Sequence, residues 1–230
     1  ARASNARYRN YKEGSPEERA AFEEAAVLFE RALEAGATSF MVDGPYADTL
    51  MALGRNAEAV VAWDRAIVTQ PTQWWVWYRK AICLWALEDA SGALESALGA
   101  LVNAPMRTQV HDLIVTITER APPGLSASAL IILAELRGEP AGGPLQTAAL
   151  QRARAAASAD SRDGDLGRYA LTREGGLPMT PRRRPTAVLA RARAGSPDAR
   201  DALAAAAREE ALVRHLARLD PVVAPLLGGP

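Results

Sequence analysis

Large apolar side chains recur along this chain with the spacing of helices. The clearest stripe lies in residues 73–87, where four such side chains follow one another at spacings of 3, 4 and 3 residues: Trp75, Tyr78, Ile82 and Trp85. Residues three or four apart share one face of a helix, whereas the side chains of a half-buried strand alternate with a period of two. No stretch of the sequence shows sustained alternation with that shorter period. The pattern therefore predicts an all-α protein.

Capping signals and breakers divide this pattern into separate helices. Ser15, Pro16 and Glu18 form the strongest start signal, with Ser as the N-cap, Pro at the first helical position and Glu three residues after the cap. The sequence Asp43-Gly44-Pro45 is interpreted as the start of the second helix. The predicted helices span residues 16–35, 43–53, 57–70, 73–87, 91–103, 106–120, 125–137, 145–158, 166–173, 186–194 and 197–219.

Two stretches of the chain repeat each other. Residues 54–71 align without a gap with residues 88–105, at an offset of 34 residues. Matching positions carry small or aromatic side chains, and these pairs are Ala59 and Ala93, Trp63 and Ala97, and Ala66 and Ala100. A weaker third copy, with Ala25, Phe29 and Ala32, lies upstream at the same offset. Small residues let two helices approach closely, so we expect the four alanines of the two clear copies to be buried between helices.

A period of 34 residues with small residues at these positions resembles the tetratricopeptide repeat family. The resemblance covers residues about 16–137 and is clearest for the two aligned stretches. It implies a right-handed α-solenoid of helical hairpins, in which each hairpin buries its apolar face on its neighbours. It also implies a scaffold that binds a protein or peptide partner, including a helical one, in its concave groove.

The chain divides into three parts on this interpretation. Residues 1–15 are expected to form a flexible N-terminal segment, residues 16–138 the solenoid, and residues 139–230 an Ala- and Arg-rich helical module that caps the solenoid or docks on it. The repeat register places Ala127, Ile131 and Ala134 in the last hairpin of the solenoid. A loop is expected at about residues 159–185, because Gly, Asp and Arg crowd there and the apolar spacing lapses.

The resemblance also indicates which side chains would line the groove. In the tetratricopeptide family, the first helix of each repeat faces the concave side. Carried over residue by residue, these positions are Trp75, Tyr78, Arg79, Ile82 and Trp85 in the central repeat, Asp48 and Met51 in the preceding repeat, and Asp112, Thr116 and Glu119 in the following repeat. The groove would have an apolar centre and mainly acidic flanks.

Two kinds of occupant are compatible with this groove. A partner peptide or helix would use the aromatic side chains as anchors, whereas the chain's own N-terminal segment or basic C-terminal helices would fill the groove from within. Some family members clamp a C-terminal carboxylate with basic and amide side chains, but only Arg79 fits that set here, so we do not expect that mode. Trp63, Trp74 and Trp77 are interpreted as packing residues between helices.

Charge is distributed unevenly along the chain, although the formal net charge is zero. Residues 1–144 carry a net charge of −5 and residues 145–230 a net charge of +5, which favours docking of the C-terminal helices on the solenoid. The most basic patch comprises residues 182–184 with Arg191 and Arg193, and such a patch attracts phosphates. No aromatic residue lies among these arginines to stack on bases, and aspartates surround them. We therefore expect a solvated loop and no nucleic-acid partner.

Catalytic and metal-binding motifs are missing from the sequence. The two histidines, His111 and His215, have no partner at metal or triad spacing, and a single cysteine, Cys83, excludes an internal disulfide. No zinc-protease, nucleophile-elbow or phosphate-loop motif occurs. We therefore expect a non-enzymatic scaffold or adaptor without cofactor or metal. The alternative is a regulatory or substrate-presenting portion of a larger enzyme whose catalytic domain lies outside this chain.

Composition indicates the cellular setting. No run of about 18 apolar residues occurs, so we expect no membrane span, and the first residues lack the apolar core of a secretory signal. The cytoplasm is then the default location. Only two of the 27 basic residues are lysine, and this bias towards Arg is typical of a GC-rich coding sequence, so we expect a bacterial source. The sequence leaves the oligomeric state open.

Overall fold

The computed structural model describes residues 14–171, 199–209, 211–219 and 223–227, together with residues 189, 192 and 195. Within these residues every regular element is helical, as the sequence pattern predicts. The elements are α1 (Pro16–Glu34), α2 (Phe40–Ala52), α3 (Asn56–Thr69), α4 (Trp74–Ala86), α5 (Ala90–Asn103), α6 (Thr108–Ile117), α7 (Pro123–Arg137), α8 (Pro144–Ala156), α9 (Arg162–Leu171), α11 (Ala199–Glu209), α12 (Ala211–Leu219) and the 3₁₀ helix η3 (Ala224–Leu227).

Several sequence predictions lie outside the described residues. They concern the N-terminal segment as far as residue 13, the stretch 172–185 of the predicted loop, and the basic patch with Arg191 and Arg193. Of the predicted helix 186–194, residues 189 and 192 alone are described, and both are helical.

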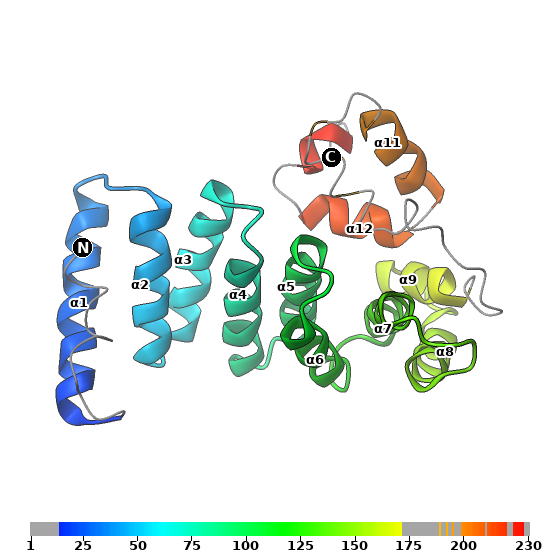
Figure 1. Ribbon diagram of the computed structural model, residues 1–230, viewed down its shortest axis with the longest axis horizontal. Coiled ribbons are helices and arrows are strands. Elements are labelled where there is room, and N and C mark those ends of the chain that lie inside the picture. The colour runs from blue at the N-terminus through cyan, green and yellow to red at the C-terminus, as the bar shows by residue number, and fades with distance from the viewer. Residues whose placement is uncertain are drawn as a thin grey trace.

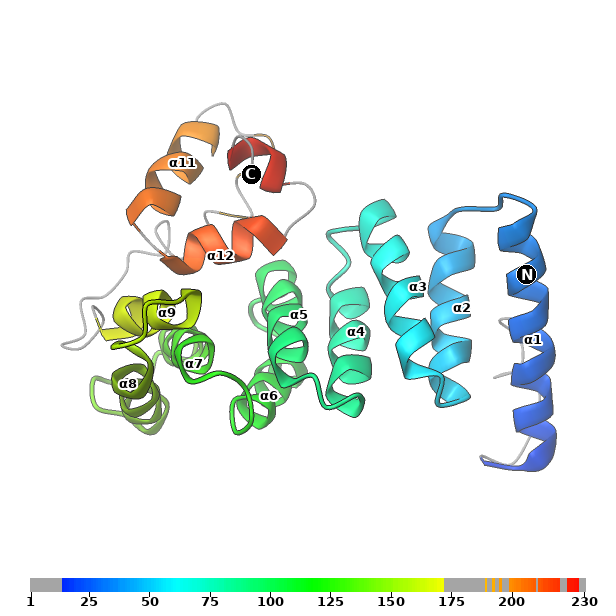
Figure 2. The same cartoon turned by 180° about the vertical axis from the view of Figure 1, so that it is seen from behind.

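The described helices pack in chain order and form three groups (Figure 1). Helices α1 to α5 stand side by side, with α6 against α5, and consecutive helices of this row contact each other. Helices α7, α8 and α9 pack together beyond α6. Helices α11 and α12 and the short η3 lie over α5 and α9, which the view from behind also shows (Figure 2). The first row thus carries the helices that the sequence assigns to the binding groove.

The small residues of the repeat lie where the helices of this row meet. Ala59, Ala66, Ala93 and Ala100 are all fully buried, which confirms the prediction made from the 34-residue offset. Trp63, between the two alanines of α3, is also fully buried. Because an alanine adds little bulk beyond the backbone, neighbouring helices approach closely at these positions and the single large ring fills the remaining space.

The contact between α4 and α5 is the most extensive helix–helix contact among the described residues. At its centre the Trp77 ring lies against Gly99, and a Cβ atom added at Gly99 would be 2.4 Å from Cε3 of that ring. The Trp77 indole N–H donates to the carbonyl oxygen of Pro71 at 2.8 Å, and the side-chain amide of Asn103 donates to the same oxygen at 3.3 Å. The sequence interpretation of Trp77 as a packing residue is therefore confirmed.

Helix α2 begins earlier than the sequence predicts. It starts at Phe40, so that Pro45 lies inside the helix instead of opening it. Pro45 has no N–H to donate to the preceding turn, but the first turn is stabilised by tertiary contacts. The Phe40 ring packs edge-on against Trp75 with centroids 5.5 Å apart, and the buried Asp43 carboxylate accepts a hydrogen bond from Arg65 at 2.6 Å.

The other helix starts agree with the sequence in part. The Ser15 hydroxyl accepts a hydrogen bond from the Glu18 N–H at 3.2 Å, as the capping signal predicts. Helix α5 is capped by Asp89, whose carboxylate accepts from the Gly92 N–H at 2.9 Å.

Helix α7 packs mainly with α8 and α9 and makes only a short contact with α6. Ala127 and Ile131 lie in a small apolar cluster with Ala149 and Ala153 of α8. This arrangement differs from the predicted last hairpin of the solenoid, in which α7 would pair with α6. The division of the chain at residue 138 stays a prediction.

A carboxylate of α9 holds the start of α7. The Asp163 carboxylate accepts hydrogen bonds from the Gly124 N–H at 3.0 Å and from the Leu125 N–H at 2.8 Å. These donors have no partner within their own helix, and a negative charge is favourable at a helix N-terminus. Helix α9 begins at Arg162, four residues before the predicted start, and the Ser161 hydroxyl just before it accepts a hydrogen bond from the Gly164 N–H at 3.2 Å.

The predicted helix 197–219 is wrong as a single element, because the chain forms two helices, α11 and α12, that pack against each other. Leu203 of α11 and Val213 and Leu216 of α12 are all buried. Folding back lets both apolar stripes share one core, whereas a straight helix of this length would leave part of them exposed.

A polar cluster joins α12 to the rest of the molecule. His215 of α12 is almost fully buried, and its Nε2 atom lies 3.1 Å from the Arg162 guanidinium of α9 and 3.6 Å from the Glu95 carboxylate of α5. The same guanidinium pairs with Glu95 at 2.5 Å. Arginine can only donate, so Nε2 accepts its hydrogen bond and the ring is neutral.

Burial, together with the smaller effects of the Arg162 and Arg218 charges, lowers the pKa of His215 to about 3. The nearby Glu95 carboxylate would favour the charged ring, but Arg162 already pairs with that carboxylate and offsets its charge. The unfolded chain then binds more protons than the folded chain between about pH 3 and pH 6.5. The free energy of unfolding therefore falls as the pH drops through this range.

Gly99→Ala should lower the free energy of unfolding by about 1–3 kcal/mol, because the added methyl group overlaps the Trp77 ring. In a helix without this contact, the same change would raise stability by about 1 kcal/mol. Urea denaturation measures the difference. The matched background is Trp77→Leu, in which the smaller side chain leaves room and the cost of Gly99→Ala should shrink. Equal stability of Gly99→Ala and the wild type would contradict the close contact.

His215→Gln should remove part of the acid sensitivity of the fold. Below about pH 6.5 the wild type should lose up to about 1.4 kcal/mol of unfolding free energy per pH unit more than the variant does. Glutamine keeps an acceptor for Arg162 but does not titrate. Urea denaturation at several pH values between 7 and 5 gives both curves, and parallel curves would show that His215 is not held neutral.

Candidate functional site

Helix α4 presents its predicted groove residues to two different neighbours. Trp75 faces α2 and α3, where its ring packs edge-on against Phe40 at 5.5 Å and against Trp63 at 5.8 Å between centroids. Arg79, on the same side, lies 3.7 Å from the Asp48 carboxylate of α2. These side chains join α2 to α4, so Trp75 is a packing residue more than a surface residue.

The other predicted residue of α2 also takes part in this packing. The Met51 sulfur accepts a hydrogen bond from the indole N–H of the buried Trp63 at 3.3 Å. Ile82 of α4 is half-buried, as is Met51. Asp48, Met51, Trp75, Arg79 and Ile82 therefore lie at or near the α2–α4 contact.

A second line of aromatic side chains on α4 faces α6. It comprises Trp74, Tyr78 and Trp85, all half-buried, and the rings of Trp74 and Tyr78 are 5.9 Å apart between centroids. Residues 74, 78 and 85 are separated by four and seven residues, so they lie on one helical stripe. We call these three side chains the aromatic line. The sequence interpretation assigned Trp74 to packing, and its half-buried ring does pack against the apolar core as well as against Tyr78.

An arginine from the α6 region stacks on each end of the aromatic line. The Arg107 guanidinium lies 5.1 Å from the centroid of the Trp74 ring, and the Arg120 guanidinium lies 5.2 Å from that of Trp85. Arg107 immediately precedes α6 and Arg120 follows it. Helices α4 and α6 therefore run in the same direction, with the aromatic line between their exposed edges.

The residues predicted to form an acidic flank on α6 make their recorded contacts with α7 and within α6, and none with the aromatic line. Asp112, Thr116 and Glu119 are all exposed, but the Asp112 carboxylate pairs with Arg137 of α7 at 3.3 Å. The Thr116 hydroxyl donates to the backbone oxygen of Asp112 at 3.0 Å. The charged groups recorded next to the aromatic line are Arg107 and Arg120, with the Glu88 carboxylate 3.7 Å from Arg120. The mainly acidic flanks stay a prediction.

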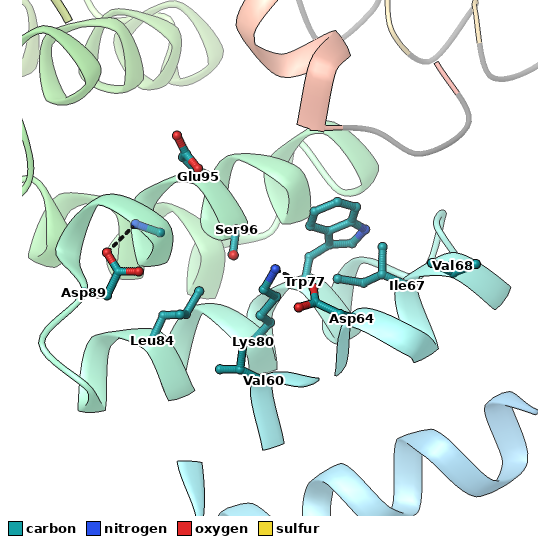
Figure 3. Close-up of a pocket in the computed structure, with 11 residues that line it drawn as sticks. Val60, Asp64, Ile67, Val68, Trp77, Lys80, Leu84, Asp89, Glu95 and Ser96 are labelled. Atoms are coloured by element: carbon teal, nitrogen blue, oxygen red, sulfur yellow. Dashed lines mark hydrogen bonds and ion pairs between the residues drawn. The ribbon is translucent and has the colours of Figure 1, made fainter. Parts of the chain in front are cut away.

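The opposite face of α4 lines a cavity of about 370 Å³ between α3 and α5. Figure 3 shows Trp77, Lys80 and Leu84 of α4 directed towards it. The Lys80 ammonium pairs with Asp64 of α3 at 2.5 Å, and Glu95 on its rim pairs with Arg162. Because these charged groups already have partners within the chain, the cavity offers fewer groups to a ligand than the aromatic line does.

The side chains of His111 and Cys83 are buried in the packing of the helices. His111 is buried, with its Nε2–H donating to the Pro105 oxygen at 2.7 Å and its Nδ1 accepting from Arg137 at 3.4 Å. Burial raises the pKa of the Cys83 thiol to about 11, so the reactive thiolate is scarce at neutral pH. Among the described residues, no group of three or more His, Cys, Asp or Glu side chains is placed to hold a metal ion.

Within the described part of the chain, no helix has both the length and the apolar character needed to cross a bilayer. Comparison with known proteins gives no match to a family model, to a curated protein or to a solved structure. The functional inference therefore depends on the geometry of the site itself.

The two faces of α4 should respond differently to truncation. Trp75→Ala should lower the free energy of unfolding by about 3 kcal/mol or more, because it removes a ring packed between two helices. Tyr78→Ala should cost less, about 1–2 kcal/mol, since the half-buried Tyr78 ring contacts the Trp74 ring and packs only partly against the apolar core. Thermal and urea denaturation of both variants measure the difference, and equal costs would show that Tyr78 is a core residue.

Proposed function

We propose that this protein is a non-enzymatic scaffold that binds a protein or peptide segment along the aromatic line of α4. The observation that carries the proposal is the half-buried line of Trp74, Tyr78 and Trp85 with an arginine stacked at each end. Trp, Tyr and Arg are the side chains most enriched at the energetic centres of protein interfaces. Burying such a ring against a partner stabilises a complex by about 1.5–3 kcal/mol.

The arrangement of the first row supports a tetratricopeptide-like solenoid as the framework of this scaffold. Helices α2, α4 and α6 run in the same direction, because Phe40 meets Trp75, Asp48 meets Arg79, and the Arg107–Trp74 and Arg120–Trp85 stacks follow the same order. In a stack of helical hairpins the first helices all run in one direction and form one side of the groove.

The described C-terminal helices favour an external partner over a groove filled from within. They pack on α5 and α9, through α12 and the His215 cluster, and lie over these helices in both views (Figures 1 and 2). The main contacts of these described helices with the rest of the chain thus lie on α5 and α9, and not on α4 or α6. The partner-binding residues that we propose are Trp74, Tyr78, Trp85, Arg107 and Arg120, with Ile82, Thr116 and Glu119 at the margin.

The double substitution Tyr78→Ala, Trp85→Ala should abolish partner capture and retain the helical circular-dichroism spectrum. The measurement is an affinity pull-down from lysate of the source organism, quantified by mass spectrometry against the wild-type bait. The matched control is Val61→Ala, Val68→Ala, which truncates two exposed side chains on α3 and should leave capture unchanged. Unchanged capture by the aromatic variant, or loss of its fold, would contradict an exposed recognition surface.

A further inference from the structure

We propose that the cavity between α3 and α5 binds a small, uncharged, mainly apolar molecule, which forms one hydrogen bond with the Ser96 hydroxyl. The α4 residues that line this cavity, among them Trp77, lie on a different face of the helix from the aromatic line. The proposal is therefore independent of the proposed function, which concerns the edge between α4 and α6.

The cavity has the size and the lining of a small-molecule site. Its volume is about 370 Å³, and such sites occupy about 300–1,000 Å³. A cavity of about 150 Å³ holds one benzene ring, so this one has room for about two rings. Most of its wall is apolar, and that part comes from α3 and α4, with the side chains Val60, Ile67, Val68, Trp77 and Leu84.

One buried polar group points into the cavity. Ser96 of α5 is only 4% exposed and lines the cavity, and Figure 3 shows its hydroxyl directed into that space. Among the described residues, none forms a hydrogen bond with this hydroxyl. The other buried serines differ, because Ser126 donates to the Ala121 oxygen and Ser128 to the Leu166 oxygen. A buried hydroxyl without a partner is unfavourable, so a ligand that pairs with Ser96 gains affinity.

The charged groups at the cavity favour an uncharged ligand. The Lys80 ammonium pairs with Asp64, Glu95 pairs with Arg162, and the Asp89 carboxylate caps the start of α5. A ligand carboxylate would lose its hydration beside three carboxylates and one ammonium that is already paired. A ligand ammonium would find these carboxylates already bonded. The Ser96 hydroxyl is thus the polar group that the cavity offers.

Indole is a suitable probe, because it is uncharged, has two fused rings and carries one N–H that the Ser96 oxygen can accept. Methyl NMR spectra of the carbon-labelled full chain, recorded during a titration with indole, should show saturable shifts for Ile67 and Leu84, which line the cavity. The methyl groups of Val61, exposed on α3, should not shift. Because the probe binds the folded chain, it should also raise the thermal midpoint.

Two related molecules test the chemistry of the ligand. Benzofuran has the shape of indole but an oxygen in place of the N–H, so the wild type should bind it about two- to tenfold more weakly, the loss of one hydrogen bond. Indoleacetate adds a carboxylate to indole and should bind at least about tenfold more weakly.

Variants of Ser96 link the binding to this cavity. Ser96→Ala removes the hydroxyl and keeps the space, so it should bind indole and benzofuran equally. Ser96→Leu fills the space and should bind neither, while the control Val61→Ala should behave as the wild type. Circular dichroism checks that each variant is folded, and if Ser96→Leu unfolds, Ser96→Ala alone decides the hydrogen bond.

Each part of the proposal has an outcome that overturns it. Unchanged methyl signals of Ile67 and Leu84 at millimolar indole would rule out the site. Indoleacetate binding as tight as that of indole would contradict an uncharged ligand, and a preference for indole over benzofuran that survives Ser96→Ala would contradict the hydrogen bond. Saturable shifts at these methyl groups, with loss of the preference in Ser96→Ala, support the proposal.

Discussion

The contact of the Trp77 ring with Gly99 holds α4 against α5, and the rest of the first row depends on it. The absence of a side chain at Gly99 lets an indole lie directly on the backbone of α5, while the Pro71 oxygen fixes the ring by accepting its N–H. One face of α4 is thereby committed to packing. The opposite face is left to carry Trp74, Tyr78 and Trp85 towards α6, so a single buried contact determines what the surface displays.

The polar contacts of the molecule fall into two kinds with different consequences. The His215, Arg162 and Glu95 cluster joins three helices that are distant in sequence and holds α12 over α5 and α9. The arginine stacks at Trp74 and Trp85 are exposed and link α4 only to the ends of α6. The first kind holds the C-terminal helices on α5 and α9, and the second kind places an arginine at each end of the aromatic line.

The sequence predicted those features that depend on local spacing. The burial of Ala59, Ala66, Ala93 and Ala100 follows from a repeat that two aligned stretches share, and the structure confirms it. The cap at Ser15 follows from three adjacent residues. The packing role predicted for Trp74 agrees with its half-buried place against the apolar core, and its helical spacing to Tyr78 and Trp85 also puts it on the aromatic line.

Features that join distant residues were not predictable in this way. The pairing of His215 with Arg162 spans 53 residues and requires α7 to leave the row and pack with α8 and α9. The early start of α2 depends on the Phe40 contact with Trp75, which no local signal indicates. The sequence between α11 and α12 contains no proline or glycine, so no local signal indicates that the helix ends there. The two helices are separated because they pack against each other around a shared core.

Exposure of the individual tryptophan rings tests the central claim most directly. In a nitrogen-labelled sample of the full chain, a soluble gadolinium chelate broadens the indole N–H signals that solvent reaches. The account predicts strong broadening for Trp74 and Trp85 of the aromatic line, and protection for Trp63 and Trp77, whose indole N–H groups bond to Met51 and Pro71. Protection of Trp74 and Trp85 to the same degree as Trp63 and Trp77 would show that the chain covers its own groove, and would contradict an open binding surface.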